Sequence, residues 1–142
     1  KMTQFPHVLK AIFLFMLAFQ QPIVAKSIEK TGKCSKGAIW ELWLSPNRKM
    51  INAHFAGKKS VQTVQNWRIV IQNNKKTVFN TTVSEGNESG SDHGDTGEDN
   101  GMKEIFHIDA KILNGNGNDN LVFRATSSKT KETCRFSHTY TS

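Results

Sequence analysis

The sequence predicts an all-β fold, an antiparallel immunoglobulin-like β-sandwich of about seven strands that is preceded by a signal peptide. Three observations predict it. Apolar side chains recur at every second position in several short segments, which is typical of strands that bury one face. Polar, turn-forming residues separate these segments, and no helical period is evident after residue 25.

The N-terminal residues have the three parts of a secretory signal peptide. A basic stretch over residues 1–10 precedes the apolar run 11–19, and polar residues with a proline follow at 20–22. The apolar run is too short for a membrane-spanning helix, which needs about 20 apolar residues. We therefore expect residues 1–25 to be cleaved. The protein is then predicted to be secreted or extracytoplasmic, without stable membrane insertion.

The remaining chain has the length of one domain with one core. Residues 26–36 are polar and are predicted to form an extended lead-in to a single β-sandwich domain over 37–142. The first predicted strand has Trp40, Leu42 and Leu44 on one parity. The same alternation, or a β-branched and aromatic composition, predicts further strands at 51–55, 67–72, 78–83, 106–112, 121–125 and 134–140. Turns are predicted at 45–47, 56–59, 73–76 and 114–119.

Residues 84–101 are predicted to form an acidic flexible loop, because this stretch contains no large apolar residue that could join a core. Carboxylates and glycines in such a loop are also the ingredients of a calcium site. The candidate ligands are Asp92, Asp95, Glu98 and Asp99, although their spacing does not match a complete EF-hand loop. A solvated loop without an ion is the alternative interpretation.

The two cysteines are predicted to form a disulfide, Cys34 with Cys134, since a secreted protein matures in an oxidising compartment. Such a bond would tie the first strand region to the last. Two unrelated buried thiols are the alternative. A zinc site is disfavoured, because two cysteines without paired spacing do not supply a tetrahedral ligand set.

Strand parity separates the three tryptophans. Trp40 and Trp67 share a parity with apolar neighbours and are predicted to lie in the core. Trp43 has the opposite parity to Trp40, so we expect it on the outer face, where an aromatic ring could stack on a sugar. The alternative is that the lead-in, the C-terminal tail or a partner covers Trp43.

No catalytic motif is recognisable, and a non-catalytic protein without a cofactor is therefore predicted. The histidines form no closely spaced pair that would indicate a metal site. His54 and His107 alternate with apolar residues and are predicted to face solvent. A metal or catalytic centre assembled from distant strands, drawing on His54, His107 or His138, is the alternative.

Charge is distributed unevenly along the chain. Six of the twelve acidic residues lie between 85 and 99, and two of the nineteen basic residues lie in the predicted signal peptide. The rest of the chain is strongly basic, which favours anionic partners. We expect an extracellular glycan, an anionic cell-surface polymer or a protein as partner, and no nucleic acid. Asn80 and Asn87 begin N-x-S/T glycosylation patterns.

One sequence pattern resembles that of a protein family. The pattern C-x5-W-x-L-x-L-S-P resembles small secreted bacterial β-sandwich proteins of unknown function; here it is formed by Cys34, Trp40, Leu42, Leu44, Ser45 and Pro46. The resemblance continues at 67–68, 78–79 and 130–135, and residues 84–101 look like an insertion. It implies secretion, a β fold and a cysteine pair, and it transfers no catalytic residue.

Three hypotheses about function follow from the sequence. The leading one is a secreted, non-catalytic binding or structural module at the cell exterior. The second is a carbohydrate-binding module that uses Trp43. The third is a small extracellular enzyme with a site at strand ends.

Overall fold

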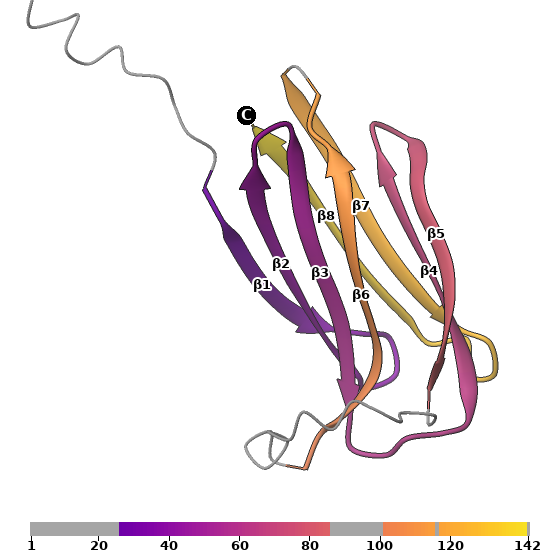
Figure 1. Ribbon diagram of the computed structural model, residues 1–142. Helices are drawn as coiled ribbons and strands as arrows, with labels where there is room; N and C mark the ends of the chain where they lie inside the picture. The colour runs from indigo at the N-terminus through magenta and orange to yellow at the C-terminus, as the bar shows by residue number, and fades with distance from the viewer. Residues whose placement is uncertain (1–25, 86–100, 116, 142) are drawn as a thin grey trace, which may run out of the picture.

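The computed structural model describes residues 26–85, 101–115 and 117–141, and these residues form two antiparallel four-stranded sheets that pack face to face (Figure 1). The predicted all-β sandwich is confirmed. Within the described residues no helix is long and apolar enough to cross a membrane. The strands are β1 (Ile28–Lys33), β2 (Ile39–Asn47), β3 (Met50–Lys59), β4 (Gln65–Asn73), β5 (Lys76–Glu85), β6 (Lys103–Leu113), β7 (Asn118–Ser127) and β8 (Thr133–Thr141).

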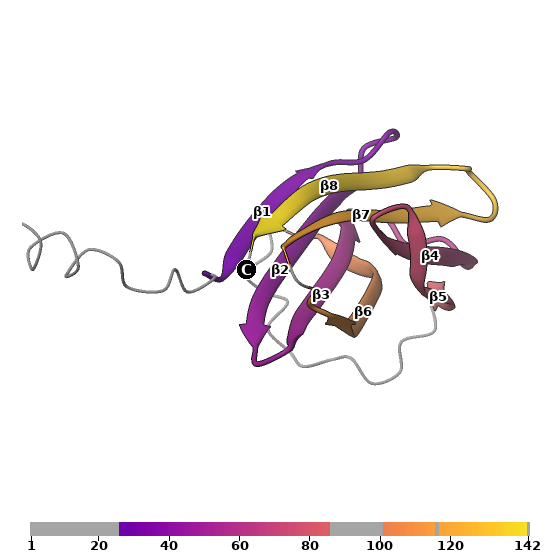
Figure 2. The same cartoon turned by 90° about the horizontal axis from the view of Figure 1, so that it is seen from above.

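The first sheet has the strand order β1-β2-β3-β6, and the second has the order β5-β4-β7-β8. The chain changes sheet between β3 and β4, between β5 and β6, and again between β6 and β7. Figure 2, a view from above, shows β1 of the first sheet beside β8 of the second. β1 and β8 are edge strands of their sheets and lie on the same side of the sandwich.

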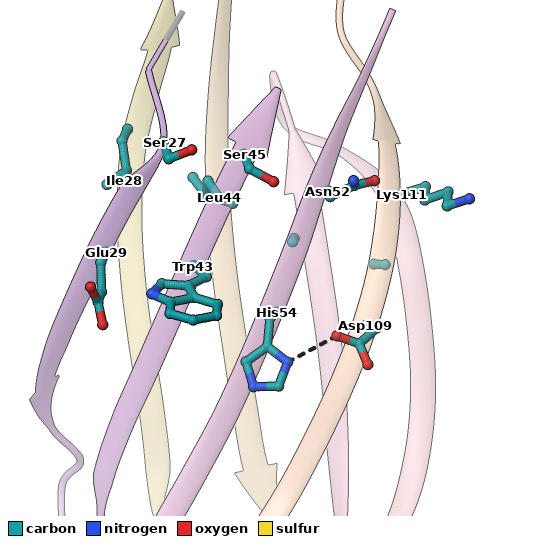
Figure 3. A pocket seen from close by; sticks show the side chains of 12 residues that line it. Ser27, Ile28, Glu29, Trp43, Leu44, Ser45, Asn52, His54, Asp109 and Lys111 are labelled. Carbon is teal, nitrogen blue, oxygen red and sulfur yellow. Dashed lines mark hydrogen bonds and ion pairs between the residues drawn. The ribbon is translucent and has the colours of Figure 1, made fainter. Parts of the chain in front are cut away.

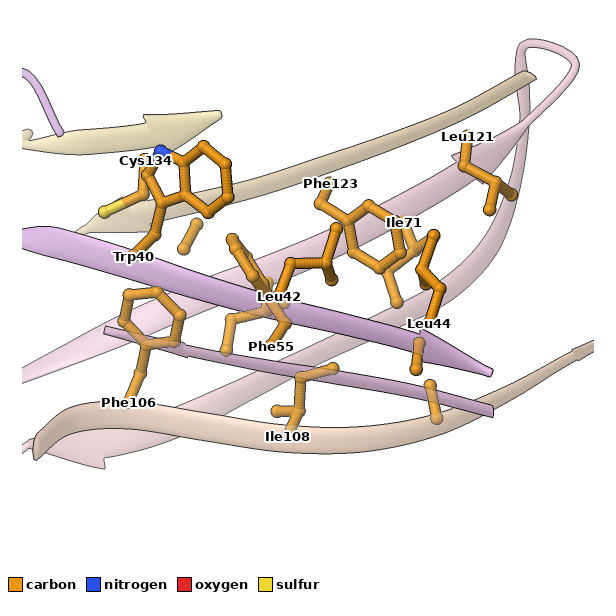
Figure 4. Packing of buried hydrophobic residues seen from close by; sticks show 14 of the residues in the cluster. Trp40, Leu42, Leu44, Phe55, Ile71, Phe106, Ile108, Leu121, Phe123 and Cys134 are labelled. Carbon is orange, nitrogen blue, oxygen red and sulfur yellow. The ribbon is translucent and has the colours of Figure 1, made fainter. Parts of the chain in front are cut away.

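Inward-facing side chains of both sheets form the core (Figure 4). Phe106 on β6 contacts both Phe55 and Trp67, each with ring centroids 5.1 Å apart, and so links the two sheets. Trp67 is fully buried and Trp40 is 6% exposed, which confirms the prediction from strand parity. Tilted aromatic pairs of this kind stabilise a core by roughly 0.5–1.5 kcal/mol beyond the burial of their area.

Residues 26–36 differ from the predicted lead-in, because they contain β1. This strand pairs with β2 along its whole length, from Ile28 opposite Leu44 to Lys33 opposite Ile39. Most of its side chains are exposed, so it shows no apolar alternation. An edge strand is held by backbone hydrogen bonds on one side, and this support leaves little signal in the side chains. The sandwich therefore has eight strands within the described residues, where about seven were predicted.

The first two predicted turns are in the wrong places. β2 continues through Pro46 to Asn47, and the reversal falls at residues 48–49, where Arg48 has a φ of 60°. Proline is tolerated there because β1 pairs with β2 only as far as Leu44, so Pro46 lies at a free edge. The turn-forming residues 45–47 therefore do not end β2, because Pro46 lies where no neighbouring strand needs a backbone N–H from it.

The second misplaced turn, at 56–59, is the end of β3. Gly57 pairs with Trp40 on one side and Phe106 on the other, and a register shift follows it. A Cβ atom at position 57 would lie 2.2 Å from the Phe106 ring. Glycine is therefore required by close packing of an aromatic ring and does not mark a turn at this position.

The predicted disulfide is confirmed. Cys34 follows β1 and Cys134 lies on β8, so their bond joins the two sheets. Two hydrogen bonds flank it: Ser35 N donates to Thr133 O, and Thr133 N donates to Ser35 Oγ, each at 2.9 Å. The bond closes the side of the sandwich where the first and last strands meet.

Glu132 supports the same junction. It is 1% exposed, and its Oε2 accepts hydrogen bonds from the backbone N–H groups of Lys36 (3.0 Å) and Ala38 (2.8 Å). Its Oε1 accepts a hydrogen bond from Lys59 Nζ at 2.9 Å. One carboxylate thus connects the β1–β2 loop, the end of β3 and the start of β8.

The acidic loop prediction is wrong at its first residues. Ser84 and Glu85 belong to β5, and Glu85 is 2% exposed. Its carboxylate accepts hydrogen bonds from Trp67 Nε1, Gln65 Nε2 and Thr63 N. A buried indole N–H needs an acceptor, so this acidic side chain completes the core instead of joining a solvated loop.

We expect the disulfide to contribute about 2–5 kcal/mol to the free energy of unfolding, because it constrains a long segment of the unfolded chain. Replacing both Cys34 and Cys134 with alanine should lower the urea midpoint accordingly, with the reduced wild-type protein as a matched comparison. A thiol assay on the denatured, unreduced protein should detect no free thiol. Two titratable thiols, or an unchanged urea midpoint, would contradict the disulfide.

We expect Glu132 to make the fold acid-sensitive. Burial by itself raises the pKa of Glu132, but hydrogen bonds from Ala38, Lys59 and Lys36 outweigh it and hold the pKa below the ordinary 4.5. The ionised group therefore stabilises the fold at pH values above about 4.5, and this contribution is lost as the pH falls through the folded-state pKa.

Glu132→Gln tests this expectation by urea unfolding between pH 3 and 7. At neutral pH the substitution should cost roughly 1–3 kcal/mol, the usual range for charged hydrogen bonds. The stability difference between wild type and variant should shrink towards pH 3. Glu29→Ala, an exposed change on β1, serves as a control and should change stability by about 0.5 kcal/mol or less. A difference that stays constant with pH would show that ionisation of Glu132 is not involved.

Candidate functional site

A groove lies on the outer face of the first sheet, with a volume of about 830 Å³ (Figure 3). All four strands of that sheet contribute to it. Its side chains include an indole, an imidazole, two carboxylates and an amide, and this mixture differs from the apolar inner face. An aromatic surface with a few polar groups around it is the usual composition of a ligand site.

The strand register places four of these side chains in one row across the sheet. Glu29 on β1 lies opposite Trp43 on β2, Trp43 lies opposite His54 on β3, and His54 lies opposite Asp109 on β6. Directly opposed residues have their Cβ atoms about 4.5–5.5 Å apart. The row therefore brings together residues that are far apart in the sequence.

Trp43 occupies the middle of this face and is 57% exposed. This exposure agrees with the predicted outward orientation. The segment predicted to be a lead-in lies beside Trp43 as strand β1 and leaves the ring open. The Trp43 ring lies 6.2 Å from the His54 ring, measured between centroids.

Next to Trp43, Asp109 is held between two histidines. His54 Nδ1 and Asp109 Oδ1 are 2.9 Å apart, and His107 Nε2 and Asp109 Oδ2 are 3.0 Å apart. Partial burial raises the pKa of the Asp109 carboxyl, but the hydrogen bonds and electrostatic attraction of both histidines outweigh it and lower the pKa overall. The carboxylate is thus kept ionised between the two rings.

The two histidines meet diagonally across the β3–β6 pair. His107 lies opposite Ala56, two positions along β3 from His54, and the histidine ring centroids are 4.6 Å apart. The small side chain of Ala56 leaves room for this approach. The sequence predicted that both histidines face solvent. Their contact was not predicted, because it depends on the register between strands separated by the segment 86–100.

The other predicted site residues do not join this cluster. His138 lies on β8 in the second sheet and stacks on Phe136 at 6.1 Å. Desolvation and nearby Lys30 lower the pKa of His138. The candidate calcium ligands Asp92, Asp95, Glu98 and Asp99 lie outside the described residues, as does Asn87. Asn80 is exposed on β5, where its Oδ1 accepts a hydrogen bond from Arg68 Nε at 3.3 Å.

The outer face of the second sheet has a different chemistry. Arg124 on β7 lies opposite Arg135 on β8, and Arg68 lies nearby on β4. Arg68, Arg124 and Lys131 line a groove of about 680 Å³ that has no acidic lining residue. Such a face attracts anions, and salt weakens this attraction when the charges are exposed.

Comparisons with family models, with curated proteins and with solved structures give no match to this chain. The resemblance to small secreted bacterial proteins thus stays a prediction. Architecture alone does not specify function, so the function is argued from the surface chemistry of the two faces.

Proposed function

We propose that this protein is a secreted, non-catalytic binding module that binds an extracellular glycan in the groove of the first sheet. The observation that carries the proposal is Trp43, a large aromatic ring exposed in the middle of a groove with polar walls. Leaving so much of an indole in water forgoes the stabilisation that burial gives, and a ligand that stacks on the ring would supply it.

The groups around Trp43 suit a polyhydroxylated ligand. Glu29 flanks the ring on one side, while His54 and Asp109 flank it on the other (Figure 3). Asn52 and Ser45 extend the polar lining along the strands. Carboxylates, amides and hydroxyls form hydrogen bonds with sugar hydroxyls, and a few such groups orient a ligand that stacks on an aromatic ring.

The extracellular location has its own support. The disulfide between Cys34 and Cys134 is compatible with an oxidising compartment outside the cytoplasm. The apolar run at 11–19, with its basic and polar flanks, is the second support, although it lies outside the described residues.

The arrangement of the histidines supports binding over catalysis. Among the described residues, the hydrogen bond of His54 is to Asp109, and no serine, threonine or cysteine is hydrogen-bonded to its ring. Nucleophilic catalysis needs such a partner within reach of the base. His54 and His107 also lie in the middle of strands, whereas the enzyme hypothesis placed its site at strand ends.

A second candidate function is favoured by the basic face of the second sheet. Arg68, Arg124 and Arg135 would attract an anionic cell-surface polymer there. The two candidates use opposite faces of the sandwich, so substitutions on one face leave the other intact.

We expect Trp43→Ala to weaken glycan binding about tenfold or more, since an aromatic contact of about 1.4 kcal/mol corresponds to this factor. The measurement is calorimetric titration of the purified protein with neutral and anionic glycans at low and physiological salt. Trp43→Phe should retain most of the affinity, and Arg68→Ala/Arg124→Ala should leave it unchanged.

Three other outcomes would contradict this proposal. Unchanged affinity in Trp43→Ala would remove the groove as the glycan site. Binding that disappears at physiological salt and in Arg68→Ala/Arg124→Ala would favour the anionic polymer on the second sheet. Glycan hydrolysis that is abolished by His54→Ala would show that the protein is an enzyme.

A further inference from the structure

The cluster of His54, His107 and Asp109 has the geometry of a metal-ligand set. The possible ligand atoms of these three residues all lie within 4.8 Å of one another. In tetrahedral zinc sites with nitrogen and oxygen ligands, metal–ligand distances of about 2.0–2.2 Å place neighbouring donor atoms roughly 3.3 Å apart. The two histidine–aspartate contacts, at 2.9 and 3.0 Å, are already close to that separation.

The three side chains come from two neighbouring strands of the first sheet. His54 lies on β3, which is paired on both sides with β2 and β6, and the other two lie on β6. His54 is directly opposite Asp109 in the register. Sites built on strands hold their ligands more accurately than sites on loops, so small side-chain movements would suffice to admit an ion.

A second, independent observation comes from Glu104. Its Oε1 lies 3.8 Å from His107 Nδ1, while His107 Nε2 faces Asp109. Metal-binding histidines usually donate the N–H of their second ring nitrogen to a carboxylate, which fixes the tautomer and orients the ring. Glu104 lies on the side of His107 where such a carboxylate would be, at an ion-pair distance that is longer than a hydrogen bond.

The identities of the ligands select the class of metal. Two imidazoles and one carboxylate suit Zn²⁺, Cu²⁺ or Ni²⁺, whereas Ca²⁺ and Mg²⁺ prefer sites made of oxygen atoms. Three protein ligands also leave a coordination position for water or another ligand. His54 and Asp109 line the groove beside Trp43, so an ion bound to them would border it.

We propose that His54, His107 and Asp109 bind a divalent transition-metal ion at the edge of the Trp43 groove, with Zn²⁺ or Cu²⁺ as the occupant. This proposal is independent of glycan binding. The competing interpretation is a purely structural cluster, in which Asp109 accepts hydrogen bonds from two neighbouring histidines and no ion binds.

The test is calorimetric titration of metal-free purified protein with ZnCl₂, without any glycan present. We expect one ion per protein molecule. His54→Gln, His107→Gln and Asp109→Asn should each weaken binding about tenfold or more, and Glu104→Gln should weaken it by about 10–100-fold. His138→Gln is the matched control and should bind Zn²⁺ like the wild type, because His138 lies in the other sheet.

Tryptophan fluorescence gives a second readout that a structural role would not produce. Trp43 is the exposed tryptophan beside His54, whereas Trp40 and Trp67 are buried. Cu²⁺ should therefore quench the wild-type emission, and the quenching should be lost in His54→Gln. Trp43→Phe should lose the quenching and keep Zn²⁺ binding by calorimetry.

Two outcomes would overturn the proposal. One is no Zn²⁺ binding by the wild-type protein. The other is Zn²⁺ binding that none of the three ligand substitutions weakens, because the ion would then bind elsewhere on the chain. Thermal unfolding of each variant checks that it is folded. Since no glycan is used, failure of this proposal and failure of the glycan proposal are separate results.

Discussion

The junction between the first and last strands is the constraint on which the rest of the structure depends. The Cys34–Cys134 bond joins the loop after β1 to β8, and Glu132 accepts backbone hydrogen bonds from that same loop. Trp40 packs on Phe136 just inside, with ring centroids 4.8 Å apart. Without these contacts, two open sheets would be held mainly by apolar packing along this side. The junction fixes the first sheet against the second, and the pairing of the four strands within the first sheet sets the outer row.

The core lies between the two sheets, so their outer faces stay exposed to solvent and carry different side chains. Because side chains alternate along each strand, one half of them fills the space between the sheets and the other half faces solvent. The first sheet presents Trp43 beside the histidine–aspartate cluster, while the second presents Arg68, Arg124 and Arg135. The proposed glycan groove and the proposed metal site share the first face, and their residues come from four strands in one register. The basic face lies on the other sheet, away from both proposed sites.

Strand parity predicted how single residues are oriented, and it did so correctly for all three tryptophans. It could not predict cross-strand contacts. His54 and His107 are 53 residues apart in the sequence, and they are close because β3 pairs with β6. The residue pattern of neither strand indicates this pairing. Buried acids were missed for a similar reason. Glu85 and Glu132 lie in polar stretches, and they are buried because donors from distant segments converge on their carboxylates.

The sequence by itself determined the fold class, the cysteine pair and the outward orientation of Trp43. The fold class and the orientation of Trp43 follow from the alternation of apolar side chains along each strand. The cysteine pair follows from the presence of two cysteines in a chain predicted to be secreted. The tertiary structure decided the strand role of residues 28–33, the true position of the first turn and the meeting of His54, His107 and Asp109. Each of these depends on which strands pair and in which register. Pairing is decided by backbone hydrogen bonds and packing across the whole sheet, and these contacts join residues far apart in the chain.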